Sequence, residues 1–254
     1  MKVKLIAYTP DPERVVALAA RMCYANTIDI ETLENGLDSA QIKRLIYQLK
    51  DSGHTSTWEH VSFSFAIEGI SRVVSHELVR HRIGCSYSQR SQRYCAEGEC
   101  DFIEPYTIRY KSKETDDDVL WSSAADDIFW SSVCNSKDDY KNLLENNIPR
   151  EDARYVLPNA TATRMIVTMN ARALLHFFNL RCCNRAMREI RELANAMLDL
   201  VKKIAPTLFE KAGASCVSLG YCPEGRMCCG RAPTLQDLKT AYNTIAGKPR
   251  VSVE

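Results

Sequence analysis

The sequence predicts an α+β fold, in which a mixed sheet with flanking helices is followed by a helical C-terminal part. Residues 61–68, VSFSFAIE, alternate apolar and polar side chains, which is typical of a strand with one buried face. Apolar residues at helical spacing form one stripe between Met187 and Ile204. The 254 residues have an ordinary globular composition, with 45% hydrophobic and 26% charged residues. We expect one domain spanning residues 1–254.

The first part of the chain alternates predicted strands and helices. Residues 3–7 alternate apolar and polar side chains as a first strand. Asp11 followed by Pro12 predicts the start of a helix that runs to about residue 23. A second helix is expected over residues 39–52 and ends at Gly53. Residues 53–60, GHTSTWEH, then form a turn that leads into the strand at 61–68.

A third helix is expected after Gly69, which ends that strand. Its apolar side chains continue to Leu78, and its last turn is expected to carry Arg80 to Arg82 before Gly84. Residues 102–110 predict a strand that returns to the sheet. The sheet and its helices would then be complete before the acidic segment that follows.

The remaining residues predict helices and a tail. Residues 111–148 are rich in Asp and Glu with tryptophans at helical spacing, so we expect an acidic helical insertion with a solvated face. Residues 151–157 are expected to be helical, and Asn170 is expected to cap a helix that runs to about residue 183. Asn184 is expected to cap the next helix, which ends at Pro206. The cysteine-containing tail, residues 213–254, is expected to be irregular.

The composition of the chain indicates where in the cell the protein is found and in which state its cysteines are. No stretch approaches the roughly 18 apolar residues of a membrane span, and the N-terminus is too short and polar for a signal peptide. We therefore expect a cytoplasmic protein without a membrane partner. Eleven cysteines is an odd number, which favours free thiols in a reducing compartment. Cys216, Cys222 and Cys228 lie six residues apart, unlike the CxxC spacing of zinc sites, so no metal is expected.

Residues 80–93, RHRIGCSYSQRSQR, concentrate positive charge in a chain whose formal net charge is only +1. The stretch contains four arginines and no carboxylate, which predicts a site for phosphate or another anion. The negative end of a helix dipole explains Arg80 or Arg82, but Arg90 and Arg93 lie beyond that helix. A solvated basic face or an RNA-contacting surface remains the alternative interpretation.

A second informative stretch, residues 170–181, places polar groups in an otherwise apolar helix. At about 100° per residue, Arg172 and His176 lie about 40° apart, and Arg181 lies about 180° from Arg172. One helix cannot direct all three into one pocket, so we expect either a broken helix or sites shared between subunits. His176 is equally well explained as a core histidine.

Phosphate groups would be bound by side chains in this protein. The sequence has no GxGxxG after a strand and no GxxxxGK[ST], which argues against a Rossmann or P-loop site. The available arginines, including Arg154, suffice for a dinucleotide and a nucleotide monophosphate. Nucleophilic catalysis is weakly indicated, because Ser91 has no His/Asp partner at a recognisable spacing. Cys85 and Cys95 lie beside cations, but this signal is not specific.

Four motifs together resemble the flavin-dependent thymidylate synthases. They are RHR followed by a Ser/Gln loop ending in Ser91-Gln92-Arg93, GHTSTWEH, the segment from Arg154 to Pro158, and the segment from Asn170 to Arg181. In the family pattern, a serine follows RHR after about seven residues. Here eight residues separate Arg82 from Ser91, and the Ser91-Gln92-Arg93 ending identifies Ser91 as the matching serine. The resemblance covers most of residues 1–205.

The resemblance implies a homotetramer that binds FAD and dUMP at subunit interfaces. It implies reductive methylation of dUMP to dTMP with 5,10-methylenetetrahydrofolate and NADPH. The FAD contacts it implies are Ser56, Arg80, His81, Arg82, Ile83, Gln89, Asn170, Arg172 and His176. The dUMP contacts it implies are Glu77, Leu78, Val79, Arg80, Gln89, Arg90, Ser91, Gln92, Arg93, Arg154 and Arg181.

The residue types suit this chemistry. A desolvated guanidinium such as Arg181 near N3 and O4 of uracil would stabilise developing negative charge, so Arg181 is the expected catalytic residue. Ser91 is expected to hold the substrate. This sequence has Glu77 where the family frequently has glutamine, and His176 where asparagine occurs. An RNA-binding protein and a flavoprotein with another substrate remain alternatives, although the even charge balance argues against nucleic acid as a partner.

Overall fold

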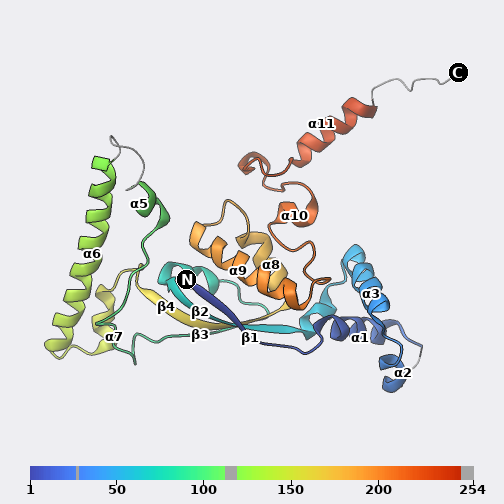
Figure 1. Ribbon diagram of the computed structural model, residues 1–254, viewed down its shortest axis with the longest axis horizontal. Coiled ribbons are helices and arrows are strands. Elements are labelled where there is room, and N and C mark those ends of the chain that lie inside the picture. The colour runs from blue at the N-terminus through green and yellow to red at the C-terminus, as the bar shows by residue number, and fades with distance from the viewer. Residues whose placement is uncertain (27–28, 112–118, 247–254) are drawn as a thin grey trace.

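The fold is built on a four-stranded sheet with strand order β1-β2-β4-β3 (Figure 1). This computed structural model describes residues 1–26, 29–111 and 119–246. The strands are β1 (Lys2–Tyr8), β2 (Ser62–Ser71), β3 (Cys85–Gln89) and β4 (Ala162–Asn170). All three strand pairs are antiparallel, so the strand directions are not mixed. The expected α+β class is confirmed.

Strands β2 and β4 form the centre of the sheet and set the positions of the helices that follow them. Ser62 pairs with Asn170 at one end and Ser71 with Ala162 at the other. The strands are antiparallel, so helix α4 (Arg72–Leu78) leaves the sheet at one end and helix α8 (Ala171–Arg181) at the other. The two segments richest in candidate site residues therefore start from opposite ends of the sheet.

One face of the sheet carries the core. Phe63 and Phe65 are fully buried, as the alternating pattern of β2 predicts. Helices α8 and α9 (Arg188–Ile204) cover this face (Figure 1). The Asn170 side chain caps α8 as predicted, by accepting a hydrogen bond from the Ala173 N–H at 2.8 Å. Helix α9 buries the predicted apolar stripe, but it begins at Arg188 and is not capped by Asn184.

The N-terminal helices lie at the end of the sheet where β4 finishes (Figure 1). They are α1 (Pro12–Tyr24), α2 (Ile30–Glu34), α3 (Ser39–Ser52) and the 3-10 helix η1 (Ser56–His60). The predicted bounds of α1 and α3 are confirmed within one residue. Gly53 ends α3 in the left-handed conformation at φ 72°, which explains why a glycine stands there.

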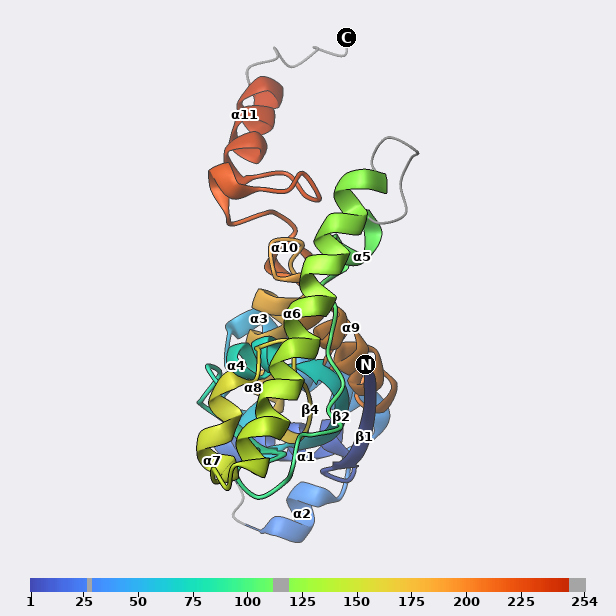
Figure 2. The same cartoon turned by 90° about the vertical axis from the view of Figure 1, so that its left-hand side faces the viewer.

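A helical arm stands at the opposite end of the sheet (Figures 1 and 2). It comprises α5 (Tyr106–Lys111), α6 (Val119–Glu145), α7 (Arg150–Ala153) and the 3-10 helix η2 (Arg154–Val156). The predicted strand at 102–110 is wrong, because only Phe102 forms a single bridge, with Thr161, before α5 begins. Helix α6 buries Val133 and Tyr140, so the acidic segment is not solvated all round. Residues 112–118 of that segment lie outside the described residues.

The cysteine-containing tail is partly helical, which corrects the expectation of an irregular segment. It contains α10 (Ser215–Leu219), the 3-10 helix η3 (Gly225–Met227) and α11 (Leu235–Ala246). Figures 1 and 2 show α11 standing away from the sheet. Residues 247–254 are outside the described part of the chain. Among the described helices, none combines the length and the apolar character needed to cross a membrane.

Candidate active site

Helix α4 fixes the start of the RHR segment. Ser71 caps the helix through its Oγ, which accepts a hydrogen bond from the Val74 N–H at 3.2 Å. The Ser71 N–H and hydroxyl both donate to the Glu189 carboxylate at 2.7 Å, which attaches this end of α4 to α9. The helix ends at Leu78, so the expectation that its last turn carries Arg80 to Arg82 is wrong. These residues instead form a turn beyond the helix.

Tyr87 holds that turn in place from the neighbouring strand β3. Its hydroxyl lies 2.9 Å from the Leu78 carbonyl oxygen and 2.6 Å from that of His81. The segment around Tyr87 was expected to be a Ser/Gln loop, but residues 85–89 form β3 and pair with β4. The alternation in Cys-Ser-Tyr-Ser-Gln is the signal that sequence reasoning missed.

Arg181, at the end of α8, lies between Glu77 and His81. Its Nη1 donates to Glu77 Oε2 at 2.5 Å, and its Nε donates to His81 Nε2 at 3.1 Å. The Arg181 and Glu77 side chains are 22% and 24% exposed, so the ion pair is partly withdrawn from water. The structure thus brings together three of the predicted site residues, from α4, the RHR segment and α8.

His81 is neutral in this arrangement. Burial, together with the nearby Arg181 and His176 side chains, lowers its pKa to about 4. The unprotonated Nε2 can therefore accept the hydrogen bond from Arg181. The His81 ring also packs edge-on against Phe177, with centroids 5.1 Å apart, and against His176 at 6.0 Å.

The predicted separation of Arg172 from Arg181 on α8 is observed. Arg172 forms an ion pair with Glu59 of η1, with a 2.6 Å distance between Nη1 and Oε1. Both side chains are about half exposed, and Ser56 is exposed in the same 3-10 helix. His176 is exposed as well, so it is not the core histidine that the alternative interpretation required.

Gln89 and Asn170 are engaged in the framework of the site. The Gln89 amide donates to Ser75 Oγ at 3.0 Å and to Thr163 Oγ1 at 3.2 Å, which joins β3 to α4 and β4. Asn170 packs against Gly84, where a Cβ atom would lie only 2.4 Å from the Asn170 Nδ2. The turn after RHR therefore requires glycine on grounds of both space and its φ of +70°.

The other arginines of the cluster lie near the helical arm. Arg90 Nε donates to Glu97 Oε1 at 3.0 Å, and the Glu97 side chain is only 5% exposed. Arg93 forms an ion pair with Glu151 at 2.5 Å and is 57% exposed. Arg154 Nε donates to the Glu151 backbone oxygen at 3.0 Å, so the Arg93 and Arg154 side chains both contact Glu151 of α7.

The remaining predicted residues divide into buried and exposed positions. Leu78 and Gln92 are buried, and the Ser91 hydroxyl accepts a hydrogen bond from the Arg93 N–H at 3.2 Å. The others face solvent: Val79, Arg80, Arg82 and Ile83, of which Ile83 is 91% exposed. Such exposure of an apolar residue that follows two exposed arginines is typical of a surface that another molecule covers.

A single chain does not gather all of these residues into one pocket. Arg154 precedes β4 and Arg172 follows it, and the nine residues of β4 span about 26 Å at roughly 3.3 Å per residue. The predicted dUMP and FAD residues therefore lie toward both ends of the sheet.

Sequence reasoning missed the carboxylates that hold the arginines. Glu59, Glu97 and Glu151 each form an ion pair with a predicted site arginine. Arginines that are partly buried need carboxylates nearby, so the basic stretch indicated in general terms that such partners exist. Their positions could not be read from the sequence, because Glu151 lies 58 residues from Arg93, which it contacts through the fold.

Comparison with known proteins identifies the family. A family model described as "Thymidylate synthase complementing protein" matches residues 4–207. A flavin-dependent thymidylate synthase from Geobacter sulfurreducens is 48% identical over 240 residues, which cover 94% of this chain and 97% of the relative. The chain belongs to the flavin-dependent thymidylate synthase family. The resemblance to this family that the four sequence motifs indicate is confirmed.

A further sequence relative and two solved structures agree with this family assignment. A Clostridium tetani relative with the same description is 44% identical and covers 94% of this chain and 96% of its own length. The flavin-dependent thymidylate synthase of Helicobacter pylori, solved with FAD and dUMP, superposes with a TM-score of 0.62 at 28% identity. That match covers 84% of this chain and all of the Helicobacter chain. A UMP/dUMP methylase from Streptomyces cacaoi, bound to 5-Br dUMP, gives a TM-score of 0.67 at 28% identity over 82% and 93% of the two chains.

Proposed function

We propose that the protein methylates dUMP to dTMP with bound FAD, 5,10-methylenetetrahydrofolate as one-carbon donor and NADPH as reductant. Family membership and the geometry around Arg181 support this proposal. The observation that carries it is the partly buried Arg181 guanidinium, oriented by Glu77 and neutral His81. A cation held in this way would stabilise the negative charge that builds on N3 and O4 as N3 loses its proton, and this charge makes C5 of uracil nucleophilic toward the one-carbon unit. Arg181 is thus the proposed catalytic residue.

The proposed dUMP site uses cations for the phosphate and Arg181 for the base. Arg93 pairs with the Glu151 carboxylate and Arg154 donates to the Glu151 backbone oxygen, so two guanidinium groups near Glu151 would be available for a phosphate. The Arg90 N–H donates to the Arg164 carbonyl oxygen and its side chain to Glu97, so Arg90 would contribute through its backbone carbonyl oxygen. The full proposed set is Glu77, Leu78, Val79, Arg80, Gln89, Arg90, Ser91, Gln92, Arg93, Arg154 and Arg181.

The residues around the RHR turn suit FAD, which is an anionic and aromatic dinucleotide. Exposed Arg80 and Arg82 can pair with its phosphates, and exposed Ile83 offers an apolar surface for its rings. Thr57, next to Ser56, buries a hydroxyl that has no partner among the described residues, which is a free polar group for a ligand. The full proposed set is Ser56, Arg80, His81, Arg82, Ile83, Gln89, Asn170, Arg172 and His176.

The bound flavin supplies reducing equivalents, so the chain needs no nucleophile of its own. The role proposed for Ser91 is therefore to hold dUMP. The chain would contribute by positioning FAD and dUMP and by placing the positive charge of Arg181 beside the uracil ring.

Complete sites would form between subunits of a homotetramer. The candidate residues lie at both ends of β4 within one chain, so a neighbouring subunit would supply the missing set. The sheet face away from α8 and α9 includes Ile166, which is 47% exposed, and a partner subunit would cover such a surface. We also propose that the chain acts as one catalytic domain in the cytoplasm and that nucleic acid is not its partner.

Tritium release from 5-tritiated dUMP tests the proposed reaction. The purified protein should be yellow from FAD and should release tritium only when both NADPH and methylenetetrahydrofolate are present. Release that does not require the folate would leave a flavin site but remove the methylation claim. Colourless protein that binds RNA with a steep salt dependence would support the RNA-binding alternative.

A pair of arginine variants tests the catalytic assignment. Arg181→Lys keeps the charge but loses the planar fork, so kcat should fall about 100-fold while FAD absorbance is retained. Arg185→Lys is the matched control, because Arg185 is exposed in the turn just beyond α8. Equal kcat values for the two variants would contradict the role of Arg181.

A further inference from the structure

The last turn of α8, which carries Arg181, is held from outside by the cysteine-containing tail. The last four carbonyl groups of an α-helix have no partner within that helix. One of them in α8, the Asn179 carbonyl oxygen, accepts a hydrogen bond from Ser215 Oγ at 3.2 Å. Ser215 is the first residue of α10. A hydroxyl group of the tail therefore caps the end of the helix that presents Arg181.

A second serine of α10 contacts the same residue of α8. Ser218 Oγ lies 3.3 Å from Asn179 Oδ1 and 3.0 Å from the Ser215 carbonyl oxygen, and it donates to both. Because one hydroxyl proton is shared between these two acceptors, the contact to Asn179 is the weaker of the two. Ser215 is thus the main link between the tail and the last turn of α8.

Hydrophobic packing fixes the position of α10 relative to α8. Ala212 and Ala214, just before α10, are 4% and 1% exposed and belong to the same core as Phe178 of α8. The Ser215 hydroxyl therefore has a defined place beside the helix end. The family model matches residues 4–207, so Ser215 lies beyond the part of the chain that it covers.

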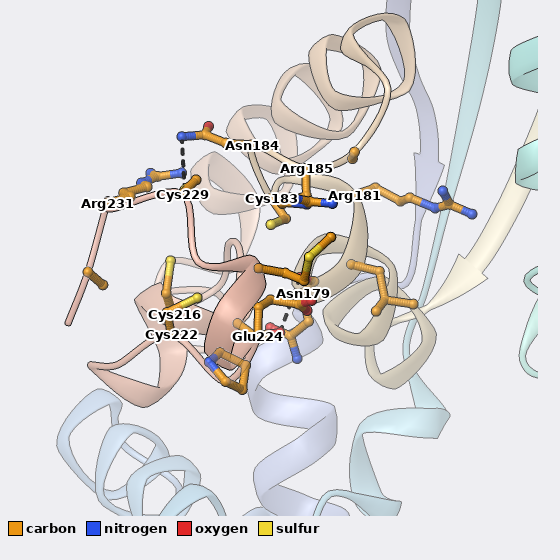
Figure 3. Close-up of a pocket in the computed structure, with 16 residues that line it drawn as sticks. Asn179, Arg181, Cys183, Asn184, Arg185, Cys216, Cys222, Glu224, Cys229 and Arg231 are labelled. Atoms are coloured by element: carbon orange, nitrogen blue, oxygen red, sulfur yellow. Dashed lines mark hydrogen bonds between the residues drawn. The ribbon is translucent and has the colours of Figure 1, made fainter. Parts of the chain in front are cut away.

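A cavity of about 320 Å³ lies between the tail and the end of α8, and Arg181 contributes to its lining (Figure 3). Figure 3 shows the Arg181 side chain extending away from Cys216 and Cys222 of the tail. Its guanidinium donates instead to Glu77 and His81. Because the space behind Arg181 is not filled by side chains, packing alone does not hold this end of α8. The hydrogen bond from Ser215 supplies a restraint that packing does not.

We propose that Ser215 is a positioning residue for the methylation, which holds the last turn of α8 so that the Arg181 guanidinium stays aligned with uracil. This inference rests on the catalytic role proposed for Arg181. A guanidinium stabilises charge on N3 and O4 only at hydrogen-bond distance, and a small displacement of a catalytic group lowers the rate. Asn179 is two residues from Arg181, so movement of the turn displaces both residues together.

Ser215→Ala in the full-length protein tests the proposal. We expect kcat for tritium release from 5-tritiated dUMP to fall about fivefold, as for the loss of one hydrogen bond. Ser215→Thr keeps the hydroxyl and should retain most of the rate. Ser52→Ala is the matched control, because Ser52 Oγ donates to the Gln48 carbonyl oxygen at 2.8 Å near the end of α3. Equal kcat values for Ser215→Ala and Ser52→Ala would overturn the proposal.

A double-mutant cycle with Arg181→Lys separates positioning from a general loss of structure. If Ser215 acts through Arg181, Ser215→Ala should lower kcat less than about twofold in the Arg181→Lys protein. Reduction of the bound FAD by NADPH without dUMP does not involve uracil, so its rate should be unchanged in Ser215→Ala.

The outcomes of the cycle distinguish this inference from the proposed function. An equal fold loss of kcat in both backgrounds, or slower FAD reduction, would overturn the role of Ser215 and leave the proposed methylation intact. Absence of tritium release from the unaltered protein would instead remove the proposed function, and the role of Ser215 with it.

Discussion

Arg181 Nη1 lies 2.5 Å from Glu77 Oε2, so the guanidinium proposed to act on uracil is neutralised by a carboxylate when no substrate is present. Glu77→Gln removes that charge but keeps a hydrogen-bond acceptor for Arg181. Because dUMP then no longer competes with a carboxylate, we expect its KM to fall about fivefold, which corresponds to roughly 1 kcal/mol for a partly exposed ion pair. Steady-state kinetics at varied dUMP would measure the change. We expect the glutamine amide to keep the contact proposed between residue 77 and dUMP, so a KM that rises would show that this contact requires the carboxylate.

The neutral state of His81 predicts a pH-dependent stability. Burial, Arg181 and His176 lower its pKa to about 4 in the folded protein, below the usual value of about 6.5. The unfolded chain therefore binds a proton at this histidine between these pH values, while the folded chain does not. The stabilisation is complete above about pH 6.5 and is lost as the pH falls through 4.

Denaturant unfolding between pH 4 and 7 would measure this contribution. His81 is only half-buried, so we expect it to account for about 1–2 kcal/mol of the loss on acidification. His81→Gln should show a correspondingly smaller loss, whereas His60→Gln, a change at an exposed histidine, should behave like the unaltered protein. Parallel pH profiles for all three proteins would refute the prediction.

Sequence patterns predicted the elements whose signals are local. Strand β2 was found from its period of two, and α8 from Asn170, whose side chain caps it. Strand β4, ATRMIVTMN, was missed because its assignment depends on pairing with β2 and β3, which are far away in sequence. The strand expected at 102–110 failed for the same reason, since an isolated apolar segment does not reveal whether a partner strand is free.

The candidate site was predicted in its residue types but not in its connections. The four motifs placed Arg181 and His81 among the site residues, yet the hydrogen bond between them joins positions 100 residues apart. The lowered pKa of His81 depends on that contact and on burial. Neither the Arg181–His81 contact nor the burial of His81 can be read from the local sequence. The motifs therefore identified the family but did not predict the geometry of the site.

Arg90 and Arg93 lie three residues apart and are expected to respond differently to substitution. Arg90→Gln leaves Glu97, whose side chain is 5% exposed, without its cation, so the free energy of unfolding should fall by about 3 kcal/mol. Arg93 is 57% exposed and pairs with a half-exposed Glu151, so Arg93→Gln should change stability little. Its loss should instead raise the KM for dUMP about 10- to 100-fold, if it binds phosphate as proposed. Denaturant titration and kinetics on both variants separate the two roles, and equal KM values would contradict them.

Gly84 and Gly53 offer a matched test of how the RHR turn is held. Their φ angles are +70° and +72°, so an alanine at either position carries similar left-handed strain of about 1 kcal/mol. At Gly53 a Cβ atom meets nothing within 4 Å, whereas at Gly84 it would lie 2.4 Å from Asn170 Nδ2 and displace the side chain that caps α8. Loss of that cap adds about 1 kcal/mol, so Gly84→Ala should lower the free energy of unfolding about twice as much as Gly53→Ala. Gly84→Ala should also weaken FAD retention, because the displaced Asn170 is a proposed FAD contact. Equal destabilisation with unchanged flavin content would show that the Asn170 side chain can move without cost.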